Sequence, residues 1–194
     1  MPAYTRLEVD ERRRRLLELG ADLFTRHAYD ELSMADIARA AGISKGLLYH
    51  YFPSKQAYFM ATLQDAAGEL EAAVRPAPLD TPAEQLAGSL GAYLAWVDEH
   101  AVAYAKLMRS VSAVPEVREV VDGVRDATAT AILAALTPTG PSAPAVRTAV
   151  RAWLWFADGA ILDWLEHRDL HRDALHGLLT RTLWASVAAA HDVG

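Results

Sequence analysis

Apolar residues recur at intervals of three and four along most of the chain, which is the spacing of one buried face of an α-helix. The first such pattern predicts a helix over residues 10–27, with Leu16, Leu23 and Phe24 on its buried side. Residues 1–9 lack the pattern and are expected to form a flexible arm. No stretch alternates apolar and polar positions in the way that indicates a strand. The expected fold class is therefore all-α.

Two short helices joined by a tight turn are predicted between residues 33 and 55. Ser33 can cap the first helix, and Asp36 can bond back to it as in a capping box. Gly42 suits the turn, because glycine enters the left-handed conformation at low cost. Ser44 can then cap the second helix.

The second short helix, about residues 44–50, buries Leu48 and Phe52 and turns its other side to solvent. A helix this short with a cation, an imidazole and phenols on its exposed side fits the recognition helix of a helix-turn-helix, which enters the major groove of DNA. Lys45 can reach a phosphate or a guanine edge, and Tyr49 can lay its ring against a thymine methyl group. The expected DNA-contacting residues are Ser33, Ser44, Lys45, Gly46, Leu47, Tyr49, His50, Tyr51 and Lys55.

Two further features add candidate phosphate contacts. A third helix is expected to begin at about Ser54, and its N-terminus together with Lys55 suits a phosphate group. Arg12 to Arg15 form a cationic run near the expected start of the first helix, where cations oppose the helix dipole. Two interpretations of this run stay open: a solvated turn with a Glu11–Arg15 ion pair, or attraction of DNA phosphates.

The rest of the chain predicts longer helices, which bring the total to about nine. They are expected at residues 54–75, 81–100, 101–111, 115–136, 145–167 and 171–191. The proline-rich stretch 76–82 is the clearest linker, and residues 137–144 are expected to form a loop. We expect a helix-turn-helix DNA-binding domain at residues 1–55 and a ligand-binding and dimerisation domain at residues 56–194, connected by the helix 54–75.

The last two predicted helices are apolar on more than one side. The segment Ala152 to Ala157 reads AWLWFA and has no polar face, so it is expected to be buried on several sides. One side would face the domain core and the other a partner subunit, because a monomer would expose an unusually large apolar patch. A homodimer through these two helices is predicted.

The larger domain is rich in side chains that suit an apolar ligand pocket between helices. The expected ligand-binding residues are Tyr93, Trp96, Tyr104, Met108, Trp153 and Phe156. The alternative is that these side chains serve only core and dimer packing. A polar anchor for the ligand would come from Asp98, Arg109 or Asp158, and the sequence does not distinguish among the three.

Composition and charge indicate the cellular compartment and the kind of partner. The 194 residues are 52% hydrophobic, which is ample for a core, and contain no cysteine, which indicates a reducing compartment. No apolar run is long enough to span a bilayer and no signal peptide opens the chain, so we expect a cytoplasmic protein without a membrane partner. The net charge of −6 argues against a generic nucleic-acid binder. However, residues 1–60 hold 9 Lys and Arg against 8 Asp and Glu, so DNA affinity must come from a local, salt-sensitive patch.

Catalytic motifs do not emerge from the sequence. There is no Gly-rich phosphate loop, no GxSxG and no HExxH, so an enzyme is the poorest interpretation and no cofactor is expected. One set of residues has spacings that would suit a metal: Asp163, Glu166, His167 and His171. An expected helix break at Asp169 disturbs their alignment, so we expect a polar surface turn there and no metal site.

Residues 10–65 resemble the TetR family of one-component bacterial transcription regulators. The resemblance rests on Ile37-Ala38, Ala41-Gly42-Ile43-Ser44-Lys45-Gly46, Leu48-Tyr49, Tyr51-Phe52 and Lys55, with Leu16-Leu17 and Leu23-Phe24 upstream. Ala28 stands where the family often has glycine. Met34 stands where threonine or valine is more usual, so no phosphate contact is expected from it. The resemblance implies terminal helices that pair in a four-helix bundle across a two-fold axis.

The expected function is a homodimeric transcriptional regulator that binds a palindromic operator in double-stranded DNA. A repressor released by a small-molecule effector is the leading interpretation. Such an effector must bind two conformations with different affinity, and could shift the helix 54–75 and so the spacing of the two DNA-binding units. The alternatives are a transcriptional activator of the same architecture, and a helical ligand-binding or interaction protein without DNA-binding activity.

Overall fold

The computed structural model describes residues 3–75, 81–137 and 140–192. Within these ranges it contains nine α-helices, one 3-10 helix and no strand, which confirms the predicted all-α fold. The elements are α1 (Ala3–Arg26), η1 (Tyr29–Glu31), α2 (Met34–Ala40), α3 (Lys45–Tyr51), α4 (Lys55–Val74), α5 (Pro82–Glu99), α6 (Ala101–Ser110), α7 (Pro115–Leu136), α8 (Pro144–His167) and α9 (Arg172–His191).

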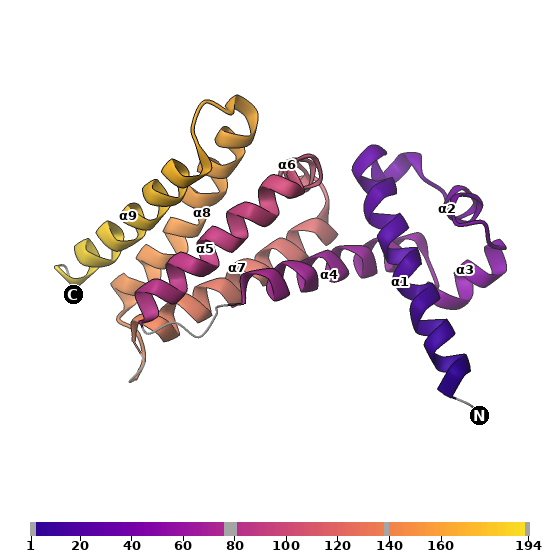
Figure 1. Cartoon of the computed structure of the whole chain (residues 1–194), viewed down its shortest axis with the longest axis horizontal. Coiled ribbons are helices and arrows are strands. Elements are labelled where there is room, and N and C mark those ends of the chain that lie inside the picture. The colour runs from indigo at the N-terminus through magenta and orange to yellow at the C-terminus, as the bar shows by residue number, and fades with distance from the viewer. Residues whose placement is uncertain (1–2, 76–80, 138–139, 193–194) are drawn as a thin grey trace.

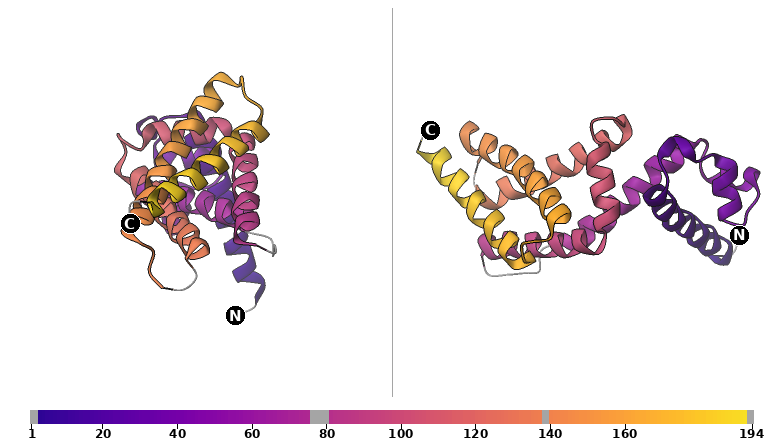
Figure 2. Two further views of the ribbon diagram at one scale, coloured as in Figure 1. Left: turned by 90° about the vertical axis from the view of Figure 1, so that its left-hand side faces the viewer. Right: turned by 90° about the horizontal axis from the view of Figure 1, so that it is seen from above.

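The helices form two bodies along the long axis of the molecule (Figure 1). Helices α1, α2 and α3 gather at one end and are called the head here, whereas α5 to α9 form a larger bundle at the other end. The second view of Figure 2 shows α4 running from the head into the bundle. This helix therefore connects the two bodies, as the sequence predicts.

Most predicted helix limits agree with the structure to within a few residues, and the clearest exception is the N-terminus. Helix α1 begins at Ala3, so the expected flexible arm is wrong for residues 3–9. Arg12 to Arg15 consequently lie inside a helix, and the expected conflict with the helix dipole does not arise. Pro144, expected within a loop, is the first residue of α8. Most of the linker expected at 76–82 lies outside the described residues.

One hydrophobic core holds the head together. Buried side chains from α1, α2 and α3, among them Leu16, Ile37 and Leu48, meet Tyr58 of α4. The Tyr58 hydroxyl also donates a hydrogen bond to the Leu16 carbonyl oxygen, which fixes α4 to α1. Because helices of seven residues are not stable alone, α2 and α3 depend on this core for their position.

Gly20 allows α1 and α4 to approach closely. A Cβ atom at this position would lie 2.5 Å from Thr62 Oγ1 and 2.8 Å from Tyr58 Oη. Both of these side chains are buried in α4. A side chain at residue 20 would therefore force the two helices apart.

Gly20→Ala is expected to lower the free energy of unfolding by about 1–3 kcal/mol, because the clash in a packed core outweighs the better helix propensity of alanine. Gly68→Ala is the matched control, since a Cβ there meets no atom within 4 Å. This control is expected to gain about 0.5–1 kcal/mol. Urea unfolding curves measure both changes, and equal stabilisation of the two variants would contradict the packing role of Gly20.

A second cluster joins the head to the bundle. The ring of Phe59 in α4 lies 4.7 Å from that of Phe24 and 4.9 Å from that of Tyr29, measured between centroids. Its other contacts include Val117 of α7. Since Phe59 faces the bundle while its neighbour Tyr58 lies in the head core, α4 is shared by both bodies. The domain limit at residues 55 and 56 stays a prediction.

The core of the larger bundle is built from α5, α6, α7, α8 and α9. Leu94, Val150, Ile161 and Leu179 are fully buried within it. Helices α8 and α9 pack along each other on one side of the bundle (Figures 1 and 2). The core thus leaves one long side of each terminal helix free for other contacts.

Candidate nucleic-acid interface

Local hydrogen bonds fix the start of both helices in the helix-turn-helix. The Asp36 amide donates to Ser33 Oγ at 3.2 Å and the Ser33 amide donates to Asp36 Oδ2 at 3.2 Å, which completes the predicted capping box. Gly42 has a φ of +66°, in the left-handed region that the turn requires. The Leu47 amide donates to Ser44 Oγ at 3.1 Å, so Ser44 caps α3 as predicted.

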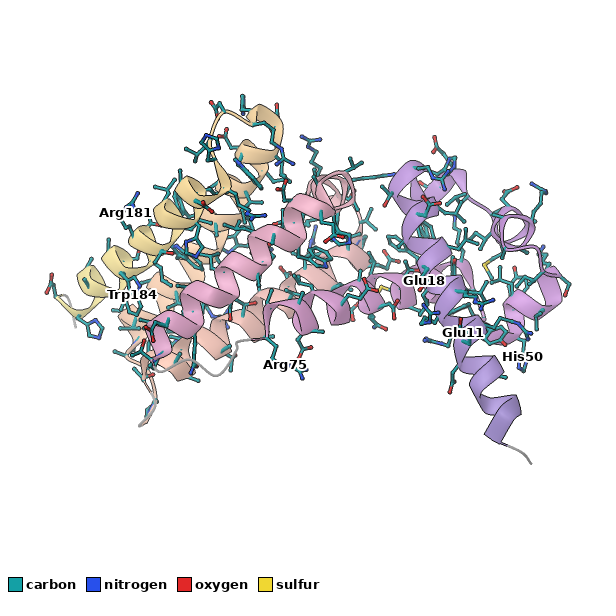
Figure 3. The ribbon with its side chains drawn as sticks, viewed as in Figure 1. Glu11, Glu18, His50, Arg75, Arg181 and Trp184 are labelled. Atoms are coloured by element: carbon teal, nitrogen blue, oxygen red, sulfur yellow. The ribbon has the colours of Figure 1, made fainter. Side chains whose placement is uncertain are left out.

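One side of α3 is open to solvent and carries Lys45, Gly46, Tyr49 and His50. Tyr49 is 43% exposed, and Lys45 Nζ lies 5.8 Å from the centroid of its ring. On the other side, Leu48 is buried in the head core. Figure 3 shows His50 at the outer side of the head. The exposed side of α3 therefore presents a cation, an imidazole and a phenol ring, and a single α-helix is narrow enough to enter a major groove.

The other predicted members of this surface are less free. Leu47 and Tyr51 are half-buried, and Tyr51 packs against the head core. The Ser33 hydroxyl donates to Asp36 Oδ2 at 2.5 Å, so this side chain serves the helix cap. The DNA contacts expected from these residues stay predictions.

Lys55 is placed differently from the expectation. Its Nζ donates to the Tyr29 carbonyl oxygen at 3.0 Å and lies 4.1 Å from the centroid of the Tyr29 ring. The ammonium therefore holds η1 against the start of α4 through a hydrogen bond and a cation–π contact. The phosphate contact expected from Lys55 stays a prediction, and it would require the ammonium to leave or share its bond to Tyr29.

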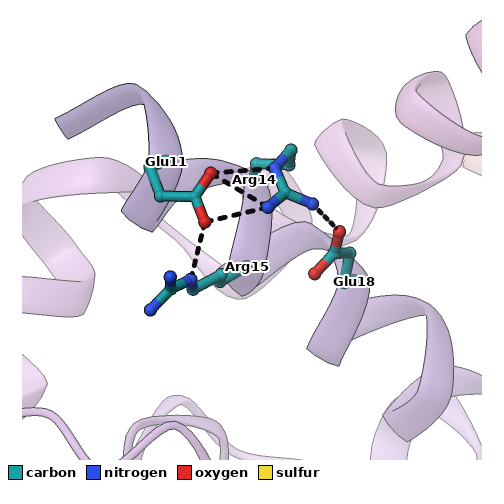
Figure 4. Close-up of polar contacts among 4 residues, drawn as sticks. All are labelled: Glu11, Arg14, Arg15 and Glu18. Atoms are coloured by element: carbon teal, nitrogen blue, oxygen red, sulfur yellow. Dashed lines mark hydrogen bonds and ion pairs between the residues drawn. The ribbon is translucent and has the colours of Figure 1, made fainter. Parts of the chain in front are cut away.

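The arginine run on α1 divides into two parts. Glu11 Oε1 accepts hydrogen bonds from Arg14 Nη2 and Arg15 Nε, both at 2.8 Å, and Arg14 also pairs with Glu18 (Figure 4). These hydrogen bonds lower the pKa of Glu11. The expected Glu11–Arg15 ion pair is thus present, which favours the solvated interpretation for Arg14 and Arg15.

Arg13 points toward the helix-turn-helix. Its guanidinium carbon lies 5.5 Å from the ring centroid of Phe52, directly after α3. The side chain is exposed, so it places a positive charge beside the recognition helix. This geometry favours the second interpretation, attraction of phosphates, for this one arginine.

Four polar side chains from four helices meet inside the larger bundle and are called the polar network here. Arg125 Nε of α7 donates to Asp158 Oδ2 of α8 at 2.8 Å, with 13% and 17% of the two side chains exposed. The hydroxyls of Tyr93 in α5 and Tyr104 in α6 lie 2.8 Å apart, and both tyrosines lie close enough to Asp158 and Arg125 for these charges to affect their pKa. Burial raises the pKa of both tyrosines, so both keep their protons at neutral pH.

Arg125 is the member of this network that sequence reasoning missed. It lies 33 residues from Asp158, and no local pattern marks it. Desolvation raises the pKa of Asp158, and the hydrogen bond from Arg125 opposes that shift. Of the three anchors left open by the sequence, Asp158 turns inward, whereas Asp98 and Arg109 form ion pairs near the surface.

The six predicted ligand-binding residues differ in burial and in their contacts. Trp153 is buried, and its Nε1 donates to the Leu179 carbonyl oxygen at 3.0 Å, so it is a core residue. Trp96 and Met108 pack against the same core. Phe156 is 44% exposed on the outside of α8, so a ligand contact by this residue stays a prediction. Only the two tyrosines of the polar network match the expected combination of burial and polarity.

The outer face of α8 and α9 carries exposed apolar and small residues at helical spacing. We call this the α8–α9 face, and it comprises Ala152, Trp155, Phe156, Gly159, Leu178, Arg181, Ala185 and Ala188. Trp155 is 63% exposed. Figure 3 shows Arg181 projecting outward from α9. Small residues between large ones allow a second pair of helices to approach closely.

The residues weighed as a metal set form a polar surface region, as expected. Asp163, Glu166, His167 and His171 are all exposed. Helix α8 ends at His167, and Arg168 follows in the left-handed conformation with a φ of +53°. None of the described helices has the length and apolar character that crossing a bilayer requires.

Comparison with known families covers both bodies of the molecule. A family described as bacterial regulatory proteins, tetR family, matches residues 16–62, and a second, described as tetracyclin repressor-like, C-terminal domain, matches residues 82–186. The first match contains the helix-turn-helix. The second contains the polar network and most of the α8–α9 face.

Solved structures agree with this. A tetR-family transcriptional regulator from Streptomyces coelicolor has 33% sequence identity and a TM-score of 0.81, and the match covers 95% of this chain and 84% of that one. A TetR-like transcriptional regulator from Rhodococcus sp. RHA1 has 26% identity and a TM-score of 0.69, with 91% and 96% coverage.

Curated relatives match over shorter regions. The transcriptional activator FasR of Mycolicibacterium smegmatis is 40% identical over 72 residues, which is 37% of this chain and 33% of that protein. The transcriptional regulator HbdR of Aromatoleum sp. is 33% identical over 92 residues, which is 46% of this chain and 40% of that protein. The matched region thus spans well under half the length of these relatives.

Proposed function

The chain belongs to the TetR family of bacterial regulatory proteins, and on this premise we propose that it is a homodimeric transcriptional regulator that binds a palindromic operator in the bacterial cytoplasm. The observation that carries the proposal is the exposed side of α3, where Lys45, Tyr49 and His50 stand opposite the buried Leu48. Each subunit would place α3 in one major groove, with half-sites about one helical turn or more apart.

Roles within this surface follow from chemistry and exposure. Gly46, Leu47 and Tyr49 are proposed to read base edges, because Gly46 and Tyr49 lie on the exposed side of α3 and Leu47, although half-buried, follows Gly46 in the first turn. Lys45 and His50 are proposed to contact phosphates, and Arg13 supports them from α1. Ser33, Ser44, Tyr51 and Lys55 are proposed as secondary DNA contacts. Ser33 and Ser44 cap helices, Tyr51 is half-buried, and Lys55 is hydrogen-bonded within the head.

Tyr49→Ala is expected to lower operator affinity by about tenfold or more, since a lost base contact costs about 1–3 kcal/mol. The operator is first selected from a pool of randomised palindromic duplexes, and affinity is then measured by fluorescence anisotropy at two salt concentrations. Because Tyr49 is exposed, folding and dimerisation should not change, which circular dichroism and mass photometry can verify.

Two companion variants separate base reading from phosphate contact. Tyr49→Phe keeps the ring and should keep most of the affinity. Lys45→Gln should weaken binding to all sequences alike and reduce the salt slope by about one unit. Wild-type affinity in both Tyr49→Ala and Lys45→Gln would remove α3 as the DNA-reading helix. If no duplex is selected at low salt, the alternative of a helical binding protein without DNA-binding activity takes its place.

The proposed dimer forms through the α8–α9 face. Its apolar residues would otherwise stay in water, and its helical spacing suits a four-helix bundle across a two-fold axis. The two-fold symmetry in turn requires a palindromic site, because each subunit presents the same α3.

The proposed effector-responsive centre is the polar network. It joins α5, α6, α7 and α8, and a buried arrangement of this kind can shift between discrete states. An effector that disturbs it would act on α4 through the cluster around Phe59 and Val117. Release from the operator is the leading proposal, and activation is the alternative because FasR is described as an activator. A reporter gene placed behind the selected operator distinguishes the two.

A further inference from the structure

Lys106 of α6 holds the C-terminal end of α1. Its Nζ donates to the Thr25 carbonyl oxygen at 3.0 Å and to the His27 carbonyl oxygen at 2.8 Å. The last carbonyl groups of a helix lack partners within that helix and form the negative end of its dipole, so an ammonium is stabilised there. Figure 1 shows α6 beside this end of α1, so the two bonds tie the bundle directly to the head.

The same lysine lines an open groove between α6 and the end of α8. The groove has a volume of about 580 Å³, within the range of small-molecule sites. Val102 and Leu165 contribute apolar surface, and Val102 is 72% exposed. Lys106, Arg109 and Arg168 contribute three positive charges.

Two of the three positive charges in the groove are paired with carboxylates, and the third is not. Arg109 pairs with Glu166 at 3.2 Å and Arg168 pairs with Asp98 at 2.6 Å. The Lys106 ammonium is bonded to two neutral carbonyl oxygens instead. The groove therefore combines exposed apolar surface with one positive charge that those bonds do not neutralise.

We propose that this groove binds an amphipathic carboxylate, and that the bound carboxylate draws Lys106 away from Thr25 and His27. A hydrogen bond from an ammonium to a carboxylate is stronger than one to a neutral carbonyl, so the exchange is favourable. The alkyl chain would cover Val102 and Leu165. Loss of the two bonds loosens the head relative to the bundle, and this regulatory consequence rests on the proposed DNA-binding function.

Sodium octanoate is the probe, and binding to the full chain without DNA is measured by titration calorimetry. Octylammonium supplies the chain with the opposite charge, and acetate supplies the charge without the chain. Octanoate is expected to bind more tightly than either. Lys106→Met, which keeps the aliphatic stem, is expected to weaken octanoate binding by about tenfold or more.

Arg147→Gln is the matched control, because it removes one exposed positive charge from the opposite end of α8, about 30 Å from Arg168. It should bind octanoate like the wild type. Arg109 also lines the groove, so Arg109→Gln should weaken octanoate binding. This variant keeps the proposal testable if Lys106→Met does not fold. Equal binding of octanoate and octylammonium, or wild-type binding by both groove variants, would overturn the proposal.

Hydrogen exchange of the amides in the last turn of α1 reports the release itself. Octanoate is expected to accelerate exchange there in the wild type. Lys106→Met should show the faster exchange without octanoate and no further change with it. Unchanged exchange in both cases would overturn the release step. Operator binding without octanoate is measured separately, so a failure of the DNA-binding proposal is seen there and not in the octanoate titration.

Discussion

Replacing Trp155 and Phe156 together by glutamate is expected to convert the dimer into monomers and to lower operator affinity by about 10²- to 10⁴-fold. Both side chains are exposed on α8 in the single chain, at 63% and 44%. Because the Trp155 ring also contacts Arg125, circular dichroism must show that the double variant keeps its helices, and Phe156→Glu alone tests the same interface without that contact. In the proposed dimer the new carboxylates would be buried against their two-fold mates without partners, which disfavours association. A monomer has one head, so it binds only one half-site and loses the gain in affinity that comes from linking two heads.

Sedimentation velocity measures the dimer, and anisotropy titration measures operator affinity. Leu170→Glu is the control, because it adds a carboxylate to an exposed apolar residue in the loop after α8 rather than on the α8–α9 face. It should remain dimeric. The monomeric double variant should still prefer the same bases on a half-site duplex, although weakly. A double variant that sediments as a dimer would refute the α8–α9 face as the interface.

Asp158→Ala is expected to lower the free energy of unfolding by about 1–3 kcal/mol, because the largely buried Arg125 guanidinium then keeps only the half-exposed Asp122 as its carboxylate partner, at 3.0 Å. The guanidinium lies between the Asp158 carboxylate and the ring of Trp155, 4.1 Å from its centroid, and only 13% of the side chain is exposed. Urea unfolding followed by tryptophan fluorescence measures the loss.

Two comparisons test the mechanism behind that loss. Arg125→Met combined with Asp158→Leu removes both charges, and it should recover most of the stability, since a buried ion pair replaced by apolar residues is often neutral. Arg109→Ala breaks an ion pair whose side chains are each 63% exposed, so it should cost no more than about 1 kcal/mol. If Asp158→Ala unfolds like Arg109→Ala, the buried network is not what holds the four helices together.

The helix-turn-helix was predictable because its determinants lie within a few residues of each other. The capping box of Ser33 and Asp36, the left-handed Gly42 and the Ser44 cap all appear where the sequence places them. The buried Leu48 follows from its spacing with Phe52. Bonds of this kind form between neighbours in the chain, so the same residues make them wherever the segment is placed.

The N-terminus was mispredicted for a physical reason. Residues 3–9 show no apolar period, although their backbone continues α1. A helix that is already nucleated extends at little cost when its next residues are ordinary helix formers. Apolar periodicity therefore indicates where a helix packs on a core, and does not by itself locate the residue at which the helix begins.

Other features depend on pairs of residues that are distant in sequence. Lys55 bonds to Tyr29, Arg125 to Asp158 and Lys106 to the end of α1, across 26, 33 and about 80 residues. Each of these cations looks like an ordinary surface charge until the partner is brought beside it. The same holds for Gly20, whose need for a hydrogen in place of a side chain comes from Tyr58 and Thr62.

By itself, then, the amino-acid order determined most of the helices outside residues 3–9 and the position and caps of the helix-turn-helix, because neighbouring residues in the chain make these bonds. Only the packing of the bundle decided that Asp158 faces inward, that Phe156 faces outward and that Lys55 is occupied within the head. The physical reason is that burial and pairing are properties of two surfaces in contact, and a helical pattern specifies one surface at a time.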